Sequence, residues 1–182
     1  MLGKSIKKGI VVFGIITLGA IVFAPTQHVA PDYLYPNHSL TPGKVDTFSY
    51  TDLTALYDGQ TYSQAHRNVS SSEKRKVCDE YPDNCKGKVE IDHFCPLALG
   101  CSNDIKNLWA QPEHAYWKGQ DFGFHTKDKL EAYMVRRMKN KEIMPSVAQA
   151  CFLEDWVACY LRYFPSTISQ LSGVEVDSED TN

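Results

Sequence analysis

An acid and an imidazole stand next to each other at Asp92-His93, directly after the short run Val89-Glu90-Ile91. The alternation of apolar and polar residues in that run predicts a strand that ends in the Asp-His pair. Burying a carboxylate or an imidazole without a partner is costly, so a strand that only packs a core gains nothing from this pair. We therefore expect a site that needs a negative charge and a base side by side.

Hydrolysis of a phosphodiester bond needs three groups that this segment could supply. A base must deprotonate water near neutral pH, and histidine is the natural choice. A divalent cation must neutralise charge on the phosphate and the leaving oxygen while it keeps open coordination sites. A third group must orient the base. Asp92, His93 and Asn107 provide one candidate for each role, and the alternative for His93 is a hydrogen-bonded surface histidine.

The longer string EIDHFCPLALGCSNDIKNLW, residues 90–109, closely resembles the HNH nuclease pattern E-x-D-H-x-x-P-L-x-x-G-G-S-N-D-x-x-N-L-W. The likeness continues in TPGKVD and SQAHRNVSSSEKRKVCDEY before the string, and in FHTKDKLE and AQACFLEDWVACY after it. It spans residues 41–164. The resemblance implies an α+β fold, in which a small ββα-metal (HNH) core carries flanking α-helices, and it implies a metal-dependent endonuclease.

The resemblance also assigns roles to individual residues. Asp92 matches a metal ligand, His93 the general base, and Asn107 the asparagine that holds the loop of the base in place. The second metal ligand comes from a helix. In the commonest HNH pattern it falls at Tyr116, which is not a ligand type, whereas the branch that this chain resembles places it at His125. His114 is the alternative for that ligand.

Asp92 supplies an anionic oxygen, which suits Mg²⁺, so we expect Mg²⁺ as the cofactor, with Mn²⁺ and Zn²⁺ as alternatives. No small-molecule cofactor is expected. Lys127 and Lys129, at the start of the expected metal-site helix, are predicted to reach backbone phosphates together with the helix N-terminus. Arg67 is a further candidate phosphate contact, with a solvated position beside a helix as its alternative. By the habit of the family, we expect DNA rather than RNA as the substrate.

The net charge of the 182-residue chain is −3, which argues against a general nucleic-acid coat protein. Three basic clusters stand at 73–76, 86–88 and 136–141, and solvated helix faces and loops are the simpler interpretation of each. An enzyme with a local basic groove is compatible with this balance. We expect weak binding without sequence preference.

Residues 1–24 combine three early lysines with an uncharged apolar run and no acid. This pattern predicts either a cleaved signal peptide or an uncleaved N-terminal membrane anchor. Both place residues 25–182 outside the cytoplasm. An uncleaved segment would make the membrane a partner of the protein.

Six cysteines fit an oxidising compartment, where disulfides are the default state. Cys78 with Cys85, and Cys95 with Cys101, bracket turn-like segments and are candidate local pairs. Cys151 and Cys159 fall in one expected helix, where a rise of about 1.5 Å per residue separates them by roughly 12 Å. That separation is too large for a disulfide between them.

Composition and capping signals divide the chain further. Residues 25–45 contain four prolines and predict a linker, 46–164 form the expected nuclease domain, and 165–182 carry four acids without a basic residue and predict a disordered acidic tail. Helices are expected at 70–81, 126–139 and from 145 onward, with capping boxes at Ser70/Glu73 and Ser146/Gln149. A rival to the enzyme is a catalytically degenerate HNH fold that acts as a binding module tethered at the cell surface.

Overall fold

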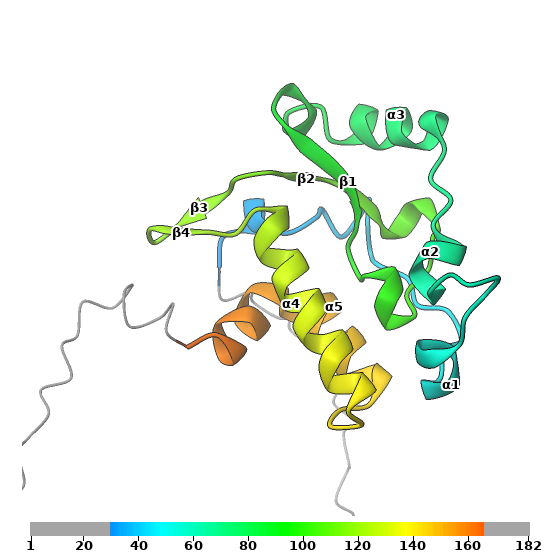
Figure 1. Ribbon diagram of the computed structural model, residues 1–182. Helices are drawn as coiled ribbons and strands as arrows, with labels where there is room; N and C mark the ends of the chain where they lie inside the picture. The colour runs from blue at the N-terminus through cyan, green and yellow to red at the C-terminus, as the bar shows by residue number, and fades with distance from the viewer. Residues whose placement is uncertain (1–29, 166–182) are drawn as a thin grey trace, which may run out of the picture.

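The computed structural model describes residues 30–165 and shows a mixed α+β fold with three disulfides, in agreement with the predicted class (Figure 1). The α-helices are α1 (Tyr50–Thr54), α2 (Tyr62–His66), α3 (Ser71–Glu80), α4 (Phe124–Lys139) and α5 (Pro145–Tyr163). The strands are β1 (Val89–His93), β2 (Leu108–Pro112), β3 (Tyr116–Trp117) and β4 (Gln120–Asp121). Short 3-10 helices are η1 (Asp32–Leu34), η2 (Asn84–Lys86), η3 (Leu97–Leu99) and η4 (Ile105–Asn107). No helix within 30–165 is both long and apolar enough to span a bilayer.

Strands β1 and β2 form an antiparallel hairpin that carries the Asp-His pair at the end of its first strand. The register pairs Glu90 with Gln111 and Asp92 with Trp109. Paired residues of an antiparallel ladder point to the same side of the sheet, and neighbours along a strand point to opposite sides. Glu90 and Asp92 therefore share one face of the hairpin with Trp109 and Gln111, and His93 belongs to the opposite face.

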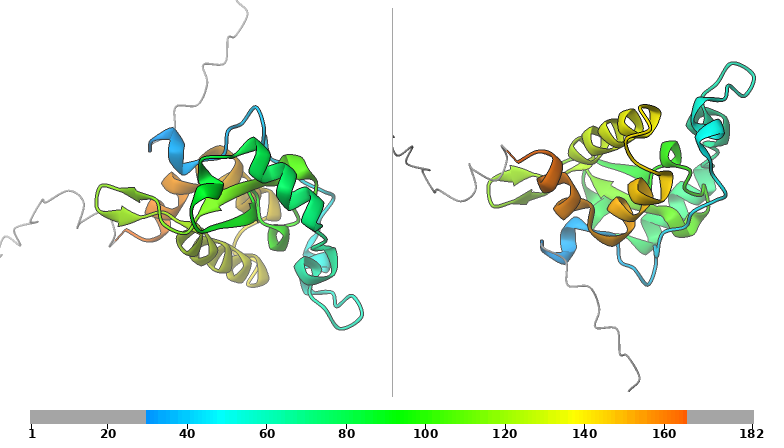
Figure 2. Two further views of the ribbon diagram at one scale, coloured as in Figure 1. Left: turned by 90° about the horizontal axis from the view of Figure 1, so that it is seen from above. Right: turned by 90° about the horizontal axis from the view of Figure 1, so that it is seen from below.

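Helix α4 follows this hairpin, but a second, smaller hairpin comes first. Strands β3 and β4 pair through Tyr116 with Asp121 and Trp117 with Gln120, and Figure 2 shows them extending from the body of the domain. This insertion explains why Tyr116 is not in a helix and why α4 begins only at Phe124. Its start lies close to the predicted Thr126.

The core lies between α4, α5 and the β1–β2 hairpin. Helices α4 and α5 pack side by side (Figure 1). Helix α4 buries an apolar face at Leu130, Met134 and Met138. The buried face of α5 consists of Ala148, Phe152, Trp156, Val157, Cys159 and Tyr160. Burial of these side chains is the main stabilising contribution at this interface, at roughly 25 cal/mol per Å² of apolar surface.

Helix α3 begins as the capping signal predicts. The Ser70 side chain accepts a bond from the backbone of Glu73, and the Glu73 carboxylate accepts one from the backbone of Ser70. The two disulfides predicted as local pairs are both present: Cys78–Cys85 joins α3 to η2, and Cys95–Cys101 closes the loop after β1. Helix α5 begins at Pro145 as predicted, but the predicted capping box of Ser146 and Gln149 is wrong, because Met144 is the N-cap and makes no side-chain bond.

The third disulfide, Cys151–Cys159, corrects the prediction that these two cysteines lie too far apart. Their Cα atoms are 5.6 Å apart. The predicted separation assumes a continuous helix, and α5 is kinked at Asp155, where φ is −161° and ψ is 87°. The Asp155 carboxylate accepts a hydrogen bond from the Ala158 amide at 2.8 Å, so Asp155 acts as an N-cap for the second half of the helix.

Residues 30–45 are not the free linker that their prolines suggest. Leu34 and Tyr35 are buried, and the indole of Trp156 donates to the Leu34 carbonyl at 3.0 Å. The Tyr35 hydroxyl donates to Asp155 at 2.6 Å. Thr41 is fully buried and donates to the Leu108 carbonyl of β2. This segment therefore belongs to the folded domain, whose predicted start at residue 46 is too late.

Two predictions lie outside the described residues. They are the signal peptide or anchor at 1–24 and, apart from residue 165, the acidic tail at 165–182.

Candidate functional site

The imidazole of His93 is buried and is held by one of its two nitrogens. Its Nε2 lies 3.0 Å from Oδ1 of Asn103, and the Asn103 amide in turn donates to the Asn68 carbonyl at 2.9 Å. Because Asn103 Oδ1 can only accept, Nε2 must carry the proton and Nδ1 must carry the lone pair. His93 Nδ1 is buried and has no hydrogen-bond partner among residues 30–165. This arrangement leaves Nδ1 as the atom that can accept a proton.

The protonation state of the ring follows from its surroundings. Burial lowers the pKa of His93, while the bond to Asn103 and the charge of Asp92 act in the opposite direction. A lowered pKa keeps the ring neutral near pH 7, which is the state that a general base requires. His93 is only 1% exposed, so other protein atoms cover the ring.

Asn107 fixes the loop that follows β1 rather than contacting the histidine ring. Its side-chain amide donates to the carbonyls of Cys95 and Ser102 at 2.9 and 2.8 Å. Its Oδ1 accepts from the Cys95 backbone at 3.0 Å, and its own carbonyl accepts from Phe94. Asn107 is fully buried, and all three bonds of its side chain are to backbone. It is therefore a positioning residue for the loop that follows His93.

The residue of α4 that meets Asp92 is Lys127. The ammonium of Lys127 forms an ion pair with Asp92 Oδ2 and donates to the His93 carbonyl at 2.7 Å. Lys127 is fully buried and also lies over the ring of Phe152, 5.6 Å from its centroid. In the arrangement described, an ammonium that is buried and bound to Asp92 is not available to substrate phosphates, the role predicted for Lys127.

Further carboxylates surround this ion pair. Glu90, Asp128 and Glu131 all have pKa values raised first by burial and then, among other charges, by the negative charge of Asp92. The pKa of Glu131 rises to about 7. Lys127 and Arg67 oppose these shifts, but their two positive charges face four carboxylates. The site therefore has more negative charge than its own cations balance.

The face of the hairpin that carries Asp92 also holds polar atoms without partners. Gln111 is fully buried, and neither its side-chain oxygen nor its nitrogen has a hydrogen-bond partner among the described residues. The indole nitrogen of Trp109 is also buried and has no hydrogen-bond partner among these residues. Buried polar groups normally find partners, so these atoms need an explanation in terms of function or bound solvent.

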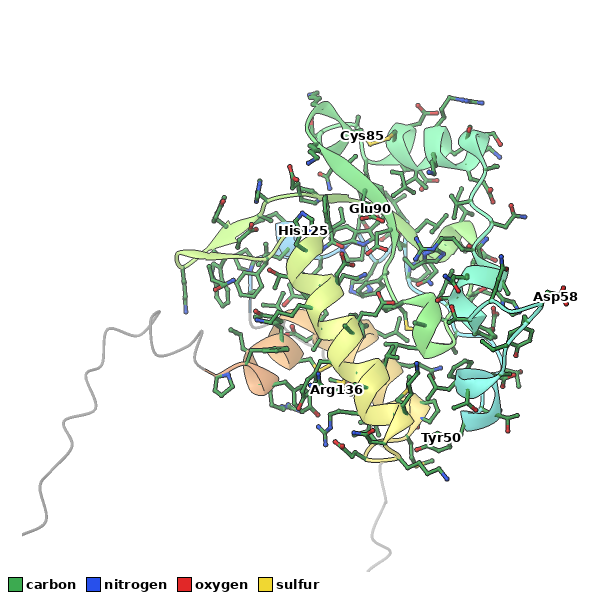
Figure 3. The ribbon with its side chains drawn as sticks, viewed as in Figure 1. Tyr50, Asp58, Cys85, Glu90, His125 and Arg136 are labelled. Carbon is green, nitrogen blue, oxygen red and sulfur yellow. A yellow bond between two sulfur atoms is a disulfide. The ribbon has the colours of Figure 1, made fainter. Side chains whose placement is uncertain are left out.

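His125, predicted as the helix ligand, contacts a different group. Its Nε2 lies 3.8 Å from Glu113, and Figure 3 shows His125 at the first turn of α4. The alternative, His114, is bound through Nδ1 to Asp121 at 2.6 Å, and its Nε2 lies 3.8 Å from Glu113. Lys88 also pairs with Glu113, and it lowers the pKa of that carboxyl. Both histidines thus belong to an exposed cluster around Glu113.

These contacts do not form the predicted metal site in the arrangement described. Asp92 offers the hard oxygen that Mg²⁺ prefers, but the ammonium of Lys127 binds it. Within residues 30–165, no group of three or more histidines, cysteines or carboxylates is placed to hold a metal ion. A divalent cation at Asp92 would require a rearrangement of Lys127.

The two remaining predicted substrate contacts, Arg67 and Lys129, lie in different surroundings. Arg67 is exposed and lines a cleft of about 610 Å³ together with Asn68, Lys74, Glu90 and Phe124. Asn68 connects this cleft to His93 through Asn103. Lys129 instead lies over the rings of Tyr160 and Phe164, at 5.9 and 4.6 Å from their centroids. Arg67 therefore stays a candidate substrate contact beside the site, and Lys129 packs against α5 and the residue after it.

Sequence reasoning missed the roles of Asn103 and Lys127 at the site. Asn103 stands inside the quoted string, so its type and place were visible, but only the fold shows that it bonds to His93. The signal for Lys127 was its position in an amphipathic helix. Counting from Leu130, Met134 and Met138, Lys127 falls on the buried face of α4.

Comparisons with protein-family models, curated proteins and solved structures found no match to this chain.

Proposed function

We propose that this protein is an exported HNH-type endonuclease that hydrolyses nucleic-acid phosphodiester bonds, with DNA as the expected substrate. The single observation that supports this most is the state of His93. Its Nε2 is fixed by Asn103, its Nδ1 has no partner within the described residues, and it adjoins Asp92 on β1. That is the arrangement a general base needs.

In the proposed reaction, Nδ1 of His93 takes a proton from the attacking water. The bond from Nε2 to Asn103 keeps the ring in the required tautomer, and Asn107 holds the backbone that follows β1. Arg67 and Lys74, in the adjacent cleft, would bind the phosphate backbone. The chemistry that a divalent ion such as Mg²⁺ supplies to such a reaction is neutralisation of charge on the phosphate and the leaving oxygen.

Location outside the cytoplasm is the second part of the proposal. Three disulfides in one small domain are consistent with an extracellular or otherwise oxidising compartment. The apolar segment at 1–24, whether a signal peptide or an anchor, is the sequence feature that would direct the domain there.

Incubation of the purified protein with supercoiled plasmid DNA tests this function directly. We expect nicked and linear products with Mg²⁺ or Mn²⁺, little product with EDTA, and about 10²–10⁴-fold slower cleavage by His93→Ala. Cleavage by His93→Ala at the native rate would remove the histidine from the role of base. A parallel assay with RNA would measure the substrate preference.

A second candidate is the degenerate HNH-fold binding module. It is favoured by the closed state of the site, because His93 is 1% exposed and Lys127 occupies Asp92. The plasmid assay separates the two candidates when it is combined with fluorescence anisotropy on labelled DNA. Binding without cleavage under any metal condition would support the module over the enzyme.

A further inference from the structure

Strand β1 has an open edge. Within residues 30–165, β1 pairs with β2 alone, so no strand lies along its other side (Figure 1). The Glu113 amide donates to the Lys88 carbonyl at one end of the ladder, and the Phe94 amide donates to the Asn107 carbonyl at the other end. Bonded and non-bonded pairs alternate along an antiparallel ladder, so these two bonds determine which residues of β1 are bonded to β2.

Every second residue of β1 directs its backbone N–H and C=O away from β2, and these residues are Val89, Ile91 and His93. The outward carbonyl of His93 is already bonded, because Lys127 donates to it at 2.7 Å. No residue within 30–165 forms a hydrogen bond to the outward groups of Val89 or Ile91. Both residues are half-buried, so this part of the edge offers backbone donors and acceptors to a further chain.

This part of the edge lines the cleft of about 610 Å³ beside the site. Arg67 and Lys74 are exposed cations of the same cleft, and neither forms an ion pair with a residue in the described part of the chain. Glu90 supplies a carboxylate. The apolar part of the lining consists of Val69, Val89, Ile91 and Phe124. An open edge is a template for an added strand, and a strand with both acidic and apolar side chains suits this lining.

A segment of that composition is present in the same chain, beyond the described residues. Residues 174–177, with the sequence VEVD, alternate β-branched apolar residues with acids, and no lysine or arginine follows Arg162. This alternation is typical of a strand with one apolar and one polar side. An acidic segment can become ordered when it binds a partner. The segment therefore matches the cleft in charge and in its apolar side chains.

The connection to this segment is long enough to reach the cleft. The ammonium of Lys129 lies 4.6 Å from the ring centroid of Phe164, near the end of the described residues. Lys129 follows the cleft residue Phe124 by five positions, which is about 7.5 Å along α4. With the lengths of the side chains included, Phe164 lies within roughly 25 Å of Phe124. Residues 165–173 can span up to about 30 Å.

We propose that residues 174–177 bind in this cleft as an added strand on the open edge of β1. The backbone of the segment bonds to the outward groups of Val89 and Ile91, and its valines contact the apolar lining. Its two acids pair with Arg67 and Lys74. Because these cations are also the proposed phosphate contacts, the bound segment excludes nucleic acid from the cleft, and only this consequence rests on the proposed function.

Amide hydrogen exchange of the full protein, followed by NMR, tests the docking without any substrate. The outward amide of Ile91 should be protected, because the added strand accepts a bond from it. Glu175→Pro with Val176→Pro removes a backbone donor from either side of the segment, so exchange at Ile91 should become at least about tenfold faster. Thr181→Pro with Asn182→Pro is the matched control beyond the segment and should leave the rate unchanged.

Charge reversal tests the pairing with the cations. Glu175→Lys with Asp177→Lys should also remove the protection of Ile91, and the further changes Arg67→Glu with Lys74→Glu should restore part of it. Circular dichroism verifies the fold, and the proline pair decides the question should the altered cleft not fold. Protection that survives the proline pair would overturn the proposal. Protection that rises with protein concentration would also overturn it, because a second copy would then supply the strand.

This measurement is independent of catalysis. A protein whose segment protects Ile91 but which cleaves no nucleic acid would retain the docking and refute the nuclease. A protein that cleaves DNA but leaves Ile91 equally unprotected in every variant would retain the nuclease and refute the docking. Where both hold, the proline pair should bind a labelled oligonucleotide several-fold more tightly than the native protein, because the cations of the cleft are then accessible.

Discussion

Asn107 and Cys95 exchange two hydrogen bonds across the loop that follows β1. The Cys95 amide donates to Asn107 Oδ1 at 3.0 Å, and the Asn107 side-chain amide donates to the Cys95 carbonyl at 2.9 Å. The side chain thus pairs with the backbone in the way that a neighbouring strand would. Because Cys95 also forms a disulfide with Cys101, both ends of this loop are fixed close to His93.

Asn107→Ala should lower the free energy of unfolding by about 2–4 kcal/mol, since it leaves the Cys95 amide and the carbonyls of Cys95 and Ser102 buried without their partner. Urea denaturation followed by tryptophan fluorescence measures the change. Lys106→Ala, an exposed neighbour, should stay within about 0.5 kcal/mol of the native protein. A loss no larger than that of the control would contradict the assigned role of Asn107.

The quoted string shows how far sequence reasoning reaches in this protein. Asp92, His93 and Asn107 fall together in the fold because β1 ends at His93 and Asn107 directly precedes β2 of the same hairpin, and local spacing is enough to predict that. The capping box of Ser70 and Glu73 is similarly local. Each of these features depends on residues whose partners lie close in the sequence.

The errors concern contacts between distant elements. His125 and Lys127 stand two positions apart at the start of α4, and which of them faces Asp92 depends on the rotation of the helix. The β3–β4 hairpin inserted before α4 removes the spacing that would fix that rotation. The partnership of Tyr35 with Asp155 spans most of the domain, and no pattern in residues 25–45 indicates it.

His93→Ala should reduce cleavage by about 10²–10⁴-fold, the usual contribution of a general base, while the melting temperature shows that the protein remains folded. Asn103→Ala should give a smaller loss, because the ring then lacks only the bond that orients it. His66→Ala, an exposed histidine of α2, is the matched control and should retain activity. Rates of plasmid nicking compare the variants, and equal activity of His93→Ala and His66→Ala would exclude the assignment.

Glu131 should make stability depend on pH. Burial raises the pKa of Glu131 to about 7, Asp92 and Asp128 act in the same direction, and Lys127 and Arg67 act in the opposite one. Between the usual glutamate pKa and about 7, the folded state binds a proton that the unfolded state has lost, so the free energy of unfolding falls as pH rises through this window. Glu131→Gln should remove this decline. The free energy of unfolding of the variant minus that of the native protein should therefore be larger at pH 8 than at pH 5.

The size of this effect should be on the order of 2 kcal/mol, and urea unfolding at a series of pH values measures it. Glu142→Gln offers a contrast, because Asn140 and Arg137 bond to that exposed carboxylate and lower its pKa. The contribution of Glu142 to the free energy of unfolding should therefore increase as pH rises, opposite in sign to that of Glu131, and it should be small. A pH profile of Glu131→Gln parallel to that of the native protein would show that Glu131 ionises normally.

The Cys151–Cys159 disulfide should stabilise the kinked form of α5. It closes a short loop, for which the chain-entropy estimate is about 2–3 kcal/mol, so Cys151→Ala with Cys159→Ala should lower the free energy of unfolding by about that amount. The kink itself should survive, because Asp155 still caps Ala158 and still accepts from Tyr35. Asp155→Ala in the same background removes both contacts and should cost further stability.

Removing the Cys78–Cys85 pair provides the control for the kink, since that disulfide closes a loop of similar length at the end of α3, far from Asp155 in the sequence. The two double-alanine variants should lose comparable stability. The stability cost of Asp155→Ala should change when Cys151–Cys159 is removed, and it should stay the same when Cys78–Cys85 is removed. Urea unfolding of the four-variant cycle measures that coupling. Strict additivity would show that the disulfide and the Asp155 cap stabilise α5 independently, and the account of a shared kink would then be wrong.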